Sequence, residues 1–349
     1  MNRQELMAKI QPLDEKAIAI ATKRWSNLAI PVHSLGKLEA VVIQIAGITG
    51  SSDIDLRKKA LVVMCADNGV VEEGISQSGQ EITLVISENF LDQKATASIM
   101  CRAVGAEIMP IDIGIATDSR LPNHKVMYGT KNMAKEPAMT RDEVMKAIET
   151  GITLVEELKE QGYKLIATGE MGIGNTTTSS AITAVLLDEA VEKVTGRGAG
   201  LSNDGLEHKI MTIKKAIDLH KPNKDDIIDV LAKVGGLDIA GMMGMFLGGA
   251  IHRVPIVIDG FISGVAALCA MRYCERAKDY MIASHLSGEP AAQMILDALK
   301  LPSFLTCDMR LGEGSGAITL FPIIDMAVAV YEDMSTFADN SMEEYVPYT

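Results

Sequence analysis

The chain has 349 residues, of which 48% are hydrophobic and only 4% aromatic, and it carries a formal net charge of −13 at pH 7. This length fits about two average domains or one large one, with enough aliphatic side chains for a sizeable core. The acidic balance disfavours nucleic acid and acidic membrane surfaces as partners, because both attract clustered Lys and Arg. A small anionic substrate is compatible with it, since local backbone dipoles can outweigh a negative overall field.

Targeting segments and metal-binding cysteines are not predicted. Residues 1–11 mix charged and apolar side chains and lack the unbroken apolar stretch of a signal peptide. No uncharged apolar run reaches the ~20 residues that a membrane-spanning helix needs. The five cysteines lie mostly in apolar segments, as buried reduced thiols do, and Cys269 and Cys274 have no histidine at zinc spacing. These features predict a cytoplasmic protein without a metal site.

The predicted elements begin with two helices, Gln4–Leu28 and Leu35–Ile48, and then alternate between strands and helices. The predicted strands are apolar on both faces, as parallel strands covered by helices are. They cover Ala60–Ala66, Ala106–Ile113, Lys164–Thr168, Val254–Ile258 and Tyr280–Ser284. The helix Thr140–Gln161 opens with the capping-box spacing of Thr140 and Glu143. This alternation predicts an α/β fold with a Rossmann-like, doubly wound parallel sheet.

The end of the chain is again helical over Ile318–Asp333, followed by a frayed or docking tail, Met342–Thr349. We therefore expect a small helical subdomain built from both termini, comprising residues 1–50 with 330–349. The Rossmann-like catalytic domain would then span residues 51–329.

The first candidate site follows the third predicted strand, because ligands in open α/β sheets bind beyond the carboxyl ends of strands. The run Thr168–Thr177 contains three glycines and leads into a helix that Asn175 can cap. Such a turn can bind an anion through free backbone N–H groups, but a glycine turn without a ligand explains the run equally well. It lacks the Gly-Lys-Ser/Thr ending of a P-loop and the glycine spacing of a dinucleotide site, which disfavours an oxidoreductase.

Glu313 is the second candidate, because it stands between Gly312 and Gly314 just before a predicted apolar helix. The glycines let the backbone approach a substrate closely while one carboxylate is presented. An acid at a helix N-terminus can also simply stabilise the helix dipole. The entropy cost of so many glycines favours the functional interpretation.

Other strand ends carry weaker candidates. His285 lies in a loop, where a single histidine is more often structural than catalytic. Arg197 and Lys209 could pair with a phosphate, although exposed cations usually serve only solubility. Asp259 is a single acid followed by glycine, whereas transferases that use phosphoribosyl pyrophosphate have two adjacent acids for magnesium. That difference disfavours this donor and an obligatory metal.

Six runs, in order along almost the whole chain, resemble the nicotinate-nucleotide:5,6-dimethylbenzimidazole phosphoribosyltransferases of cobalamin lower-ligand activation. They are residues 34–39, 66–69, 169–177, 259–264, 284–290 and 310–316. The resemblance implies transfer of the 5-phosphoribosyl group of nicotinate mononucleotide to a lower-ligand base, giving α-ribazole 5′-phosphate and nicotinate. It implies no cofactor, since nicotinate in the mononucleotide is a quaternary pyridinium and leaves without protonation or metal help.

The resemblance assigns the catalytic base to Glu313, with Glu170 beside the ribose or base as a partial substitute. General-base help is typically worth ~10²–10⁴ in rate. It places the phosphate along residues 172–176 and sugar hydroxyls near Asp259. The substrate-binding residues that it implies are Ser76, Gln80, Gly172, Gly174, Asn175, Thr176, Lys209, Asp259, Ser287, Gly288, Leu311 and Gly312.

The acceptor and the oligomeric state stay open at this stage. Residues 74–80 are small and polar where many relatives have an aromatic residue or Pro near Gly79, so a benzimidazole, a phenol such as p-cresol and a purine are all candidates. The family habit and the apolar, Gly-rich segment 235–250 suggest a homodimer or a heterodimer with a paralogue. A non-catalytic nucleotide-binding paralogue is disfavoured by the intact glycine frame around Glu313.

Overall fold

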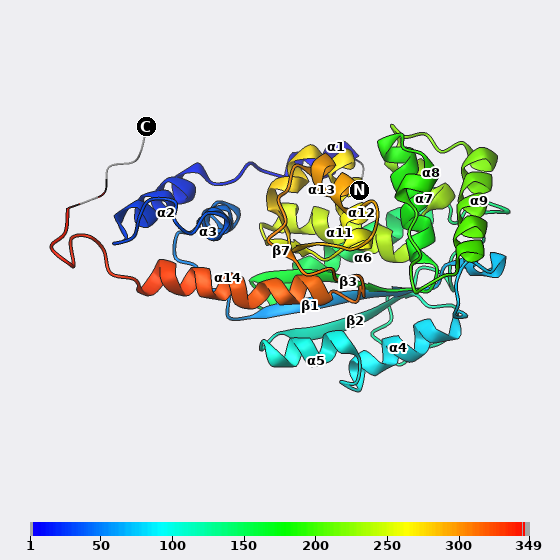
Figure 1. Ribbon diagram of the computed structural model, residues 1–349, viewed down its shortest axis with the longest axis horizontal. Coiled ribbons are helices and arrows are strands. Elements are labelled where there is room, and N and C mark those ends of the chain that lie inside the picture. Colours follow the sequence, from blue (N-terminus) through cyan, green and yellow to red (C-terminus); the bar gives the residue numbers. More distant parts are fainter. Residues whose placement is uncertain (1–2, 344, 346–349) are drawn as a thin grey trace.

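The computed structural model describes residues 3–343 and 345, and its centre is a parallel sheet (Figure 1). Within these residues the sheet has five strands, in the order β2-β1-β3-β4-β5, and every neighbouring pair is parallel. The strands are β1 (Lys59–Ala66), β2 (Glu107–Gly114), β3 (Leu165–Met171), β4 (Ile256–Ile258) and β5 (Met281–Ala283). The predicted α/β sheet and its five strands are confirmed, with small shifts at the strand ends.

Successive side chains of β1 enter two different cores, because a strand alternates its side chains between the two faces of a sheet. Val62 and Met64 belong to the core that contains α6 (Arg141–Glu160) and α11 (Leu237–His252). Leu61 and Val63 belong to the core on the opposite face. That second core contains α3 (Lys37–Thr49), α5 (Thr96–Ala103) and α14 (Ser315–Asp333). Figure 1 shows α6 and α11 on one side of the sheet and α5 on the other.

Helix α11 is buried within the chain and packs closely on α6. Every residue from Leu237 to Ala250 is buried. A Cβ atom added to Gly244 would lie 2.1 Å from the backbone oxygen of Ile148 on α6, so only glycine allows the two helices to approach this closely. The prediction that segment 235–250 serves association between chains is therefore wrong: its glycines serve packing inside one chain.

The predicted helix Gln4–Leu28 is also wrong, because it is two helices, α1 (Arg3–Lys9) and α2 (Glu15–Asn27). Pro12 lies between them and cannot donate a helical hydrogen bond. Asp14 then caps α2 by accepting from the Ala17 N–H at 2.9 Å. Helices α2 and α3 pack together and α3 packs on α14 (Figure 1). In α1, Arg3 instead donates to the carbonyl of Tyr273 at the end of α12 (Phe261–Tyr273). The division into residues 1–50 with 330–349 and 51–329 stays a prediction, and the predicted tail Met342–Thr349 lies largely outside the described residues.

Helix α14 covers the sheet as a core helix. Among the described helices, it alone is long and apolar enough to cross a membrane by composition, but 50% of its apolar window is buried in the fold. Cys65, Cys101, Cys269 and Cys274 are buried and Cys307 is exposed, which confirms the predicted character of the thiols.

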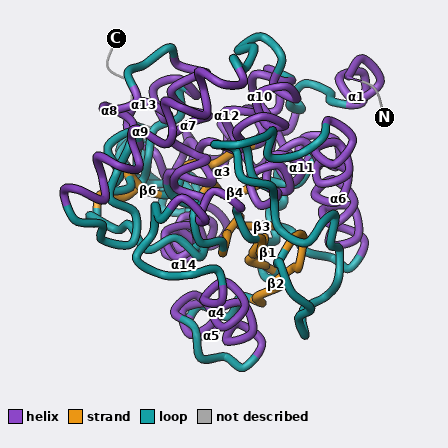
Figure 2. The backbone as a smooth tube through the Cα atoms, turned by 90° about the vertical axis from the view of Figure 1, so that its right-hand side faces the viewer, coloured by secondary structure: helices purple, strands orange, loops and turns teal. Residues whose placement is uncertain are grey.

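The remaining elements extend the layers on both faces of the sheet. Figure 2 shows α4 beside α5, and α7 and α9 on the far side of the strands from them. These elements are α4 (Glu81–Leu91), α7 (Asn175–Leu187), α8 (Val191–Val194), α9 (Asn203–His220), α10 (Ile227–Val234), α12 (Phe261–Tyr273), α13 (Ala292–Leu299), the 3₁₀ helices η1 (Gly69–Glu73) and η2 (Glu275–Tyr280), and the small parallel pair β6 (His285–Leu286) and β7 (Leu305–Thr306).

Candidate active site

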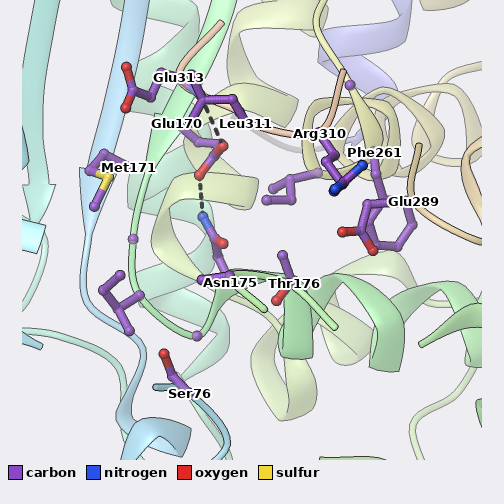
Figure 3. Close-up of a pocket in the computed structure, with 18 of the residues that line it drawn as sticks. Ser76, Glu170, Met171, Asn175, Thr176, Phe261, Glu289, Arg310, Leu311 and Glu313 are labelled. Atoms are coloured by element: carbon purple, nitrogen blue, oxygen red, sulfur yellow. Dashed lines mark hydrogen bonds between the residues drawn. The ribbon is translucent and has the colours of Figure 1, made fainter. Parts of the chain in front are cut away.

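A cavity of about 300 Å³ lies at the carboxyl ends of β3 and β4, where an open α/β sheet is expected to bind its ligand. Figure 3 shows side chains from several loops pointing into it. Its walls come from segments that are distant in the sequence but adjacent in space: residues 75–77, 170–176, 197–199, 201, 259–263, 285, 287, 289 and 310–313, with Ile86 and Lys209.

One end of the cavity is suited to an anion. Helix α7 begins there with Gly174 at its N-cap, at φ +93°, and the first N–H groups of a helix have no partner within the helix. The Lys209 ammonium is 1% exposed and donates to the Thr176 hydroxyl at 2.8 Å and to the Gly196 carbonyl at 3.2 Å. Burial lowers the pKa of Lys209 to about 8, although Glu289 opposes this. A buried cation beside a helix N-terminus favours the binding of an anion such as a phosphate group.

Glu289 and Arg310 line the same end. Burial raises the pKa of Glu289, while the charges of Lys209 and Arg310 oppose this. The Oε2 atom of Glu289 has no hydrogen-bond partner among the residues that the structure describes. The hydroxyl of Ser287 accepts from the Glu289 N–H at 3.4 Å, which fixes the turn before α13.

Asp259, at the end of β4, caps helix α14. Its carboxylate accepts from the N–H groups of Gly314 at 3.2 Å, Gly316 at 2.8 Å and Ala317 at 3.1 Å. Burial raises the pKa of Asp259, and the nearby His285 opposes this. Both oxygens of Asp259 are therefore engaged by the loop that carries Glu313, and its predicted contact with sugar hydroxyls stays a prediction.

Glu313 has an unusual backbone, with φ +61°, in the turn between β7 and α14. Its carboxylate accepts from the Ala97 N–H at 3.2 Å, in the first turn of α5. Burial raises the pKa of Glu313, Asp259 adds to this and the Ala97 hydrogen bond opposes it. The glycine frame follows from the crowding around it: a Cβ on Gly312 would collide with the Glu170 carboxyl, and one on Gly314 would collide with the Leu61 side chain. The carboxylate thus contacts a helix N-terminus, but that of α5 and not that of α14.

Glu170, at the end of β3, is the second carboxylate. It is 7% exposed, accepts from the Asn175 amide, and accepts from the Glu313 N–H at 3.4 Å. Burial and the charge of Asp238 raise the pKa of Glu170 to about 8, so it is largely protonated at neutral pH.

The end of the cavity next to Glu313 is apolar. Met171 and Leu311 lie near Glu313 (Figure 3), and Leu311 is 55% exposed. Ile75 and Ile86 are further apolar residues of the cavity wall. Ser76 also lines the cavity, and Figure 3 shows it on the opposite side from Glu313. An apolar slot with few polar groups suits a flat aromatic ring.

A family model described as phosphoribosyltransferase matches residues 10–342. The chain belongs to this family. Among curated relatives of this phosphoribosyltransferase, the nicotinate-nucleotide–dimethylbenzimidazole phosphoribosyltransferase of Clostridium tetani is 48% identical over 97% of the chain and 94% of the relative. The one from Ruminiclostridium cellulolyticum is 48% identical over 99% of each chain. A crystal structure of CobT from Thermus thermophilus superposes with a TM-score of 0.88 at 35% identity, over 95% of this chain and 100% of that one. The resemblance drawn from the sequence is confirmed.

Most of the predicted site residues meet in this phosphoribosyltransferase cavity. Those that line it are Ser76, Glu170, Gly172, Gly174, Asn175, Thr176, Lys209, Asp259, Ser287, Leu311, Gly312 and Glu313. Two do not: Gln80 donates to the Asn68 carbonyl at 3.2 Å beside α4, and the Gly288 N–H donates to the Met309 carbonyl at 2.9 Å. The roles of all these residues stay predictions.

Sequence reasoning gave no role to several residues of the site. Met171 and Arg310 stood inside runs that carried the resemblance, so their position was a usable signal. Ile86 lies on an ordinary helix and gave none. Arg197 and His285, which were weak candidates, both line the cavity. The Arg197 guanidinium already donates to the Leu201 carbonyl at 2.8 Å within its own loop.

Proposed function

We propose that this chain transfers the 5-phosphoribosyl group of nicotinate mononucleotide to 5,6-dimethylbenzimidazole, giving α-ribazole 5′-phosphate and nicotinate. The names of its relatives support these substrates. The observation that carries the proposal is the shape of one cavity, with an anion end at Lys209 and an apolar end beside Glu313. The two carboxylates, Glu170 and Glu313, lie between the ends, where the reacting C1′ atom would be placed (Figure 3).

The chemistry follows from this arrangement. The donor phosphate binds at the start of α7, with Lys209 and Thr176, and the ribose extends toward Glu313. Nicotinate leaves as a neutral ring from a quaternary pyridinium, so its departure needs no proton. One nitrogen of the azole attacks C1′ while Glu313 removes the proton from the other. A raised pKa makes Glu313 a better proton acceptor, provided that it is ionised. Attack opposite the leaving group inverts C1′ and gives the α-linked product.

Two finer points belong to the same proposal. We place the enzyme in the cytoplasm and expect a dimer, either of identical chains or with a paralogue, which light scattering of the purified chain would measure. A phenolic acceptor has no support from the relatives named above, which carry dimethylbenzimidazole in their names, and it is not proposed.

The test is to incubate the purified chain with nicotinate mononucleotide and dimethylbenzimidazole and to detect ribazole phosphate by mass spectrometry. Glu313→Gln should lower the rate by at least ~10²-fold, because the amide cannot accept the ring proton. Asp333→Asn is the matched control, since it removes an exposed acid at the far end of α14 and should leave the rate unchanged. Absence of product at any enzyme concentration would refute the function, and a near-normal rate in Glu313→Gln would refute the role of that residue.

A further inference from the structure

A continuous line of hydrogen bonds connects the proposed base to a buried residue outside the cavity. The Asn175 amide nitrogen donates to Asp238 Oδ2 at 3.0 Å and also to Glu170 Oε2. Glu170 Oε1 accepts from the backbone N–H of Glu313 at 3.4 Å. Figure 3 shows the part of this line from Asn175 through Glu170 to the Glu313 loop. The line joins α11, α7, β3 and the turn before α14.

Asp238 is locked in place and does not belong to the cavity wall. It is 0% exposed and is not among the described residues that line the cavity. Its Oδ1 atom accepts from the Ile239 N–H at 3.0 Å. A Cβ on Gly236 would lie 2.5 Å from Oδ1, and one on Gly172 would lie 3.0 Å from Oδ2, so the backbone closes around the carboxylate. Asp238 therefore lies outside the cavity wall and is linked to Glu170 through the Asn175 amide and through its own charge.

The Asn175 amide is oriented by this carboxylate. Its NH₂ group has two hydrogens, and each is directed at a carboxyl oxygen, one on Asp238 and one on Glu170. Without an acceptor at Asp238, the amide could rotate and turn its oxygen toward Glu170. The glutamate would then lose a donor and the turn at Glu313 would lose its support.

The charged groups that face Glu170 are all acidic. Asp238 faces it from α11 and Asp259 from the end of β4, while the turn before α14 presents the backbone N–H of Glu313. The Cys65 thiol faces it from β1 and is itself kept neutral, because burial raises its pKa. Negative neighbours favour the neutral form of a buried carboxyl group.

We propose that Asp238 is a positioning residue for the base of this enzyme. Its Oδ2 atom orients the Asn175 amide, which holds the Glu170 carboxyl in place, and this carboxyl supports the backbone of Glu313 in its left-handed conformation. The charge of Asp238, and not the amide, favours the neutral form of Glu170. Two neighbouring glutamates thereby receive different tasks: Glu170 stays protonated, and Glu313 stays free to accept a proton. The inference rests on the proposed function for its catalytic consequence, but not for its structural part.

The direct test is an infrared pH titration of the ligand-free protein. The carboxyl band that disappears in Glu170→Gln is assigned to Glu170, and its midpoint in the wild type should lie near 8. Asp238→Asn keeps the shape and removes the charge, so the Glu170 midpoint should fall by at least about one pH unit. Asn175→Ala removes a donor that stabilises the ionised form, so the midpoint should rise instead. If Asp238→Asn does not fold, the opposite shift in Asn175→Ala carries the test.

Activity gives the second readout. Asp238→Asn should move the alkaline limit of kcat to lower pH and reduce kcat at least ~10-fold with little change in KM for the mononucleotide. Asp325→Asn, a remote acid paired with Lys59, is the control that should shift neither the midpoint nor the limit. An unchanged Glu170 midpoint in Asp238→Asn would overturn the inference. If the chain makes no ribazole phosphate while the infrared shifts occur as expected, the proposed function fails and the positioning role stands.

Discussion

Replacing Lys209 by Met should make the ligand-free protein more stable and should weaken its binding of nicotinate mononucleotide. The Lys209 ammonium is 1% exposed, and burial lowers its pKa from the ordinary 10.5 to about 8. At pH 7 the fold therefore holds a charged group in a place that disfavours the charge. One pH unit corresponds to ~1.4 kcal/mol, so this burial costs the ligand-free fold roughly 3 kcal/mol. Methionine fills a similar volume without charge, and the variant should gain up to about that amount.

The gain should depend on pH in a defined way. Below pH 8 both the folded and the unfolded Lys209 are protonated, so the cost is fully present. Between pH 8 and 10.5 the folded state releases the proton while the unfolded state keeps it, and the stability of the wild type rises with pH. The advantage of Lys209→Met should therefore shrink above pH 8 and vanish near 10.5.

Function should change in the opposite direction. A hydrogen bond to a charged group contributes roughly 2–3 kcal/mol, so loss of the ammonium should raise KM for nicotinate mononucleotide about 10²-fold. Urea unfolding at pH 7 and pH 10, with and without inorganic phosphate, measures stability, and steady-state rates measure KM. Lys215→Met, an exposed lysine on the same helix, is the control for loss of charge. A variant that is less stable than the wild type at pH 7, or whose KM is unchanged, would refute this reasoning.

Two further substitutions test the packing that supports the site. Gly244→Ala should destabilise the fold by more than ~2 kcal/mol, because its Cβ would lie 2.1 Å from the backbone oxygen of Ile148. Gly264→Ala is the control and should destabilise the fold less, because its Cβ would meet only a side chain at 3.0 Å. Equal shifts in the melting temperatures of the two variants would contradict this prediction. Lys125→Met should lower the free energy of unfolding, measured in urea, by ~3–5 kcal/mol, because it removes the ion-pair partner of the buried Asp112 carboxylate at 3.0 Å. A decrease below ~1 kcal/mol would show that the carboxylate is satisfied by other donors.

The sheet was predictable because its strands have a strong local signature. β1 sends alternate side chains into two apolar cores, so its sequence is apolar without interruption, and that pattern is visible in one chain. The capping box of α6 was equally local, and Thr140 and Glu143 make the expected reciprocal hydrogen bonds. The break between α1 and α2 also has a local signal, Pro12, but the helical periodicity on both sides of it predicts one continuous helix.

The site was predictable only in part, because its residues come from several elements that packing brings together. Glu170, Glu313 and the start of α7 lie in glycine-rich turns, which stand out in a sequence. Asp238 lies one residue into an apolar helix, and Ile86 lies on the face of another; each has a role only because β3 and α14 lie opposite. Segment 235–250 is a further example, since its glycines do not indicate whether the helix packs against another chain or against a helix of the same chain.

The position of helix α14 in the sequence means that the proposed base is synthesised after the sheet. Its first turn is held by Asp259, its leading loop carries Glu313, and its body packs on α3 from the beginning of the chain. The ribosome makes this helix after all five strands of the sheet, so the nascent chain can complete the sheet while the base is still missing. The active site is therefore complete only when α14 packs on α3, and a fusion that disturbs this packing would reduce catalysis from a distance.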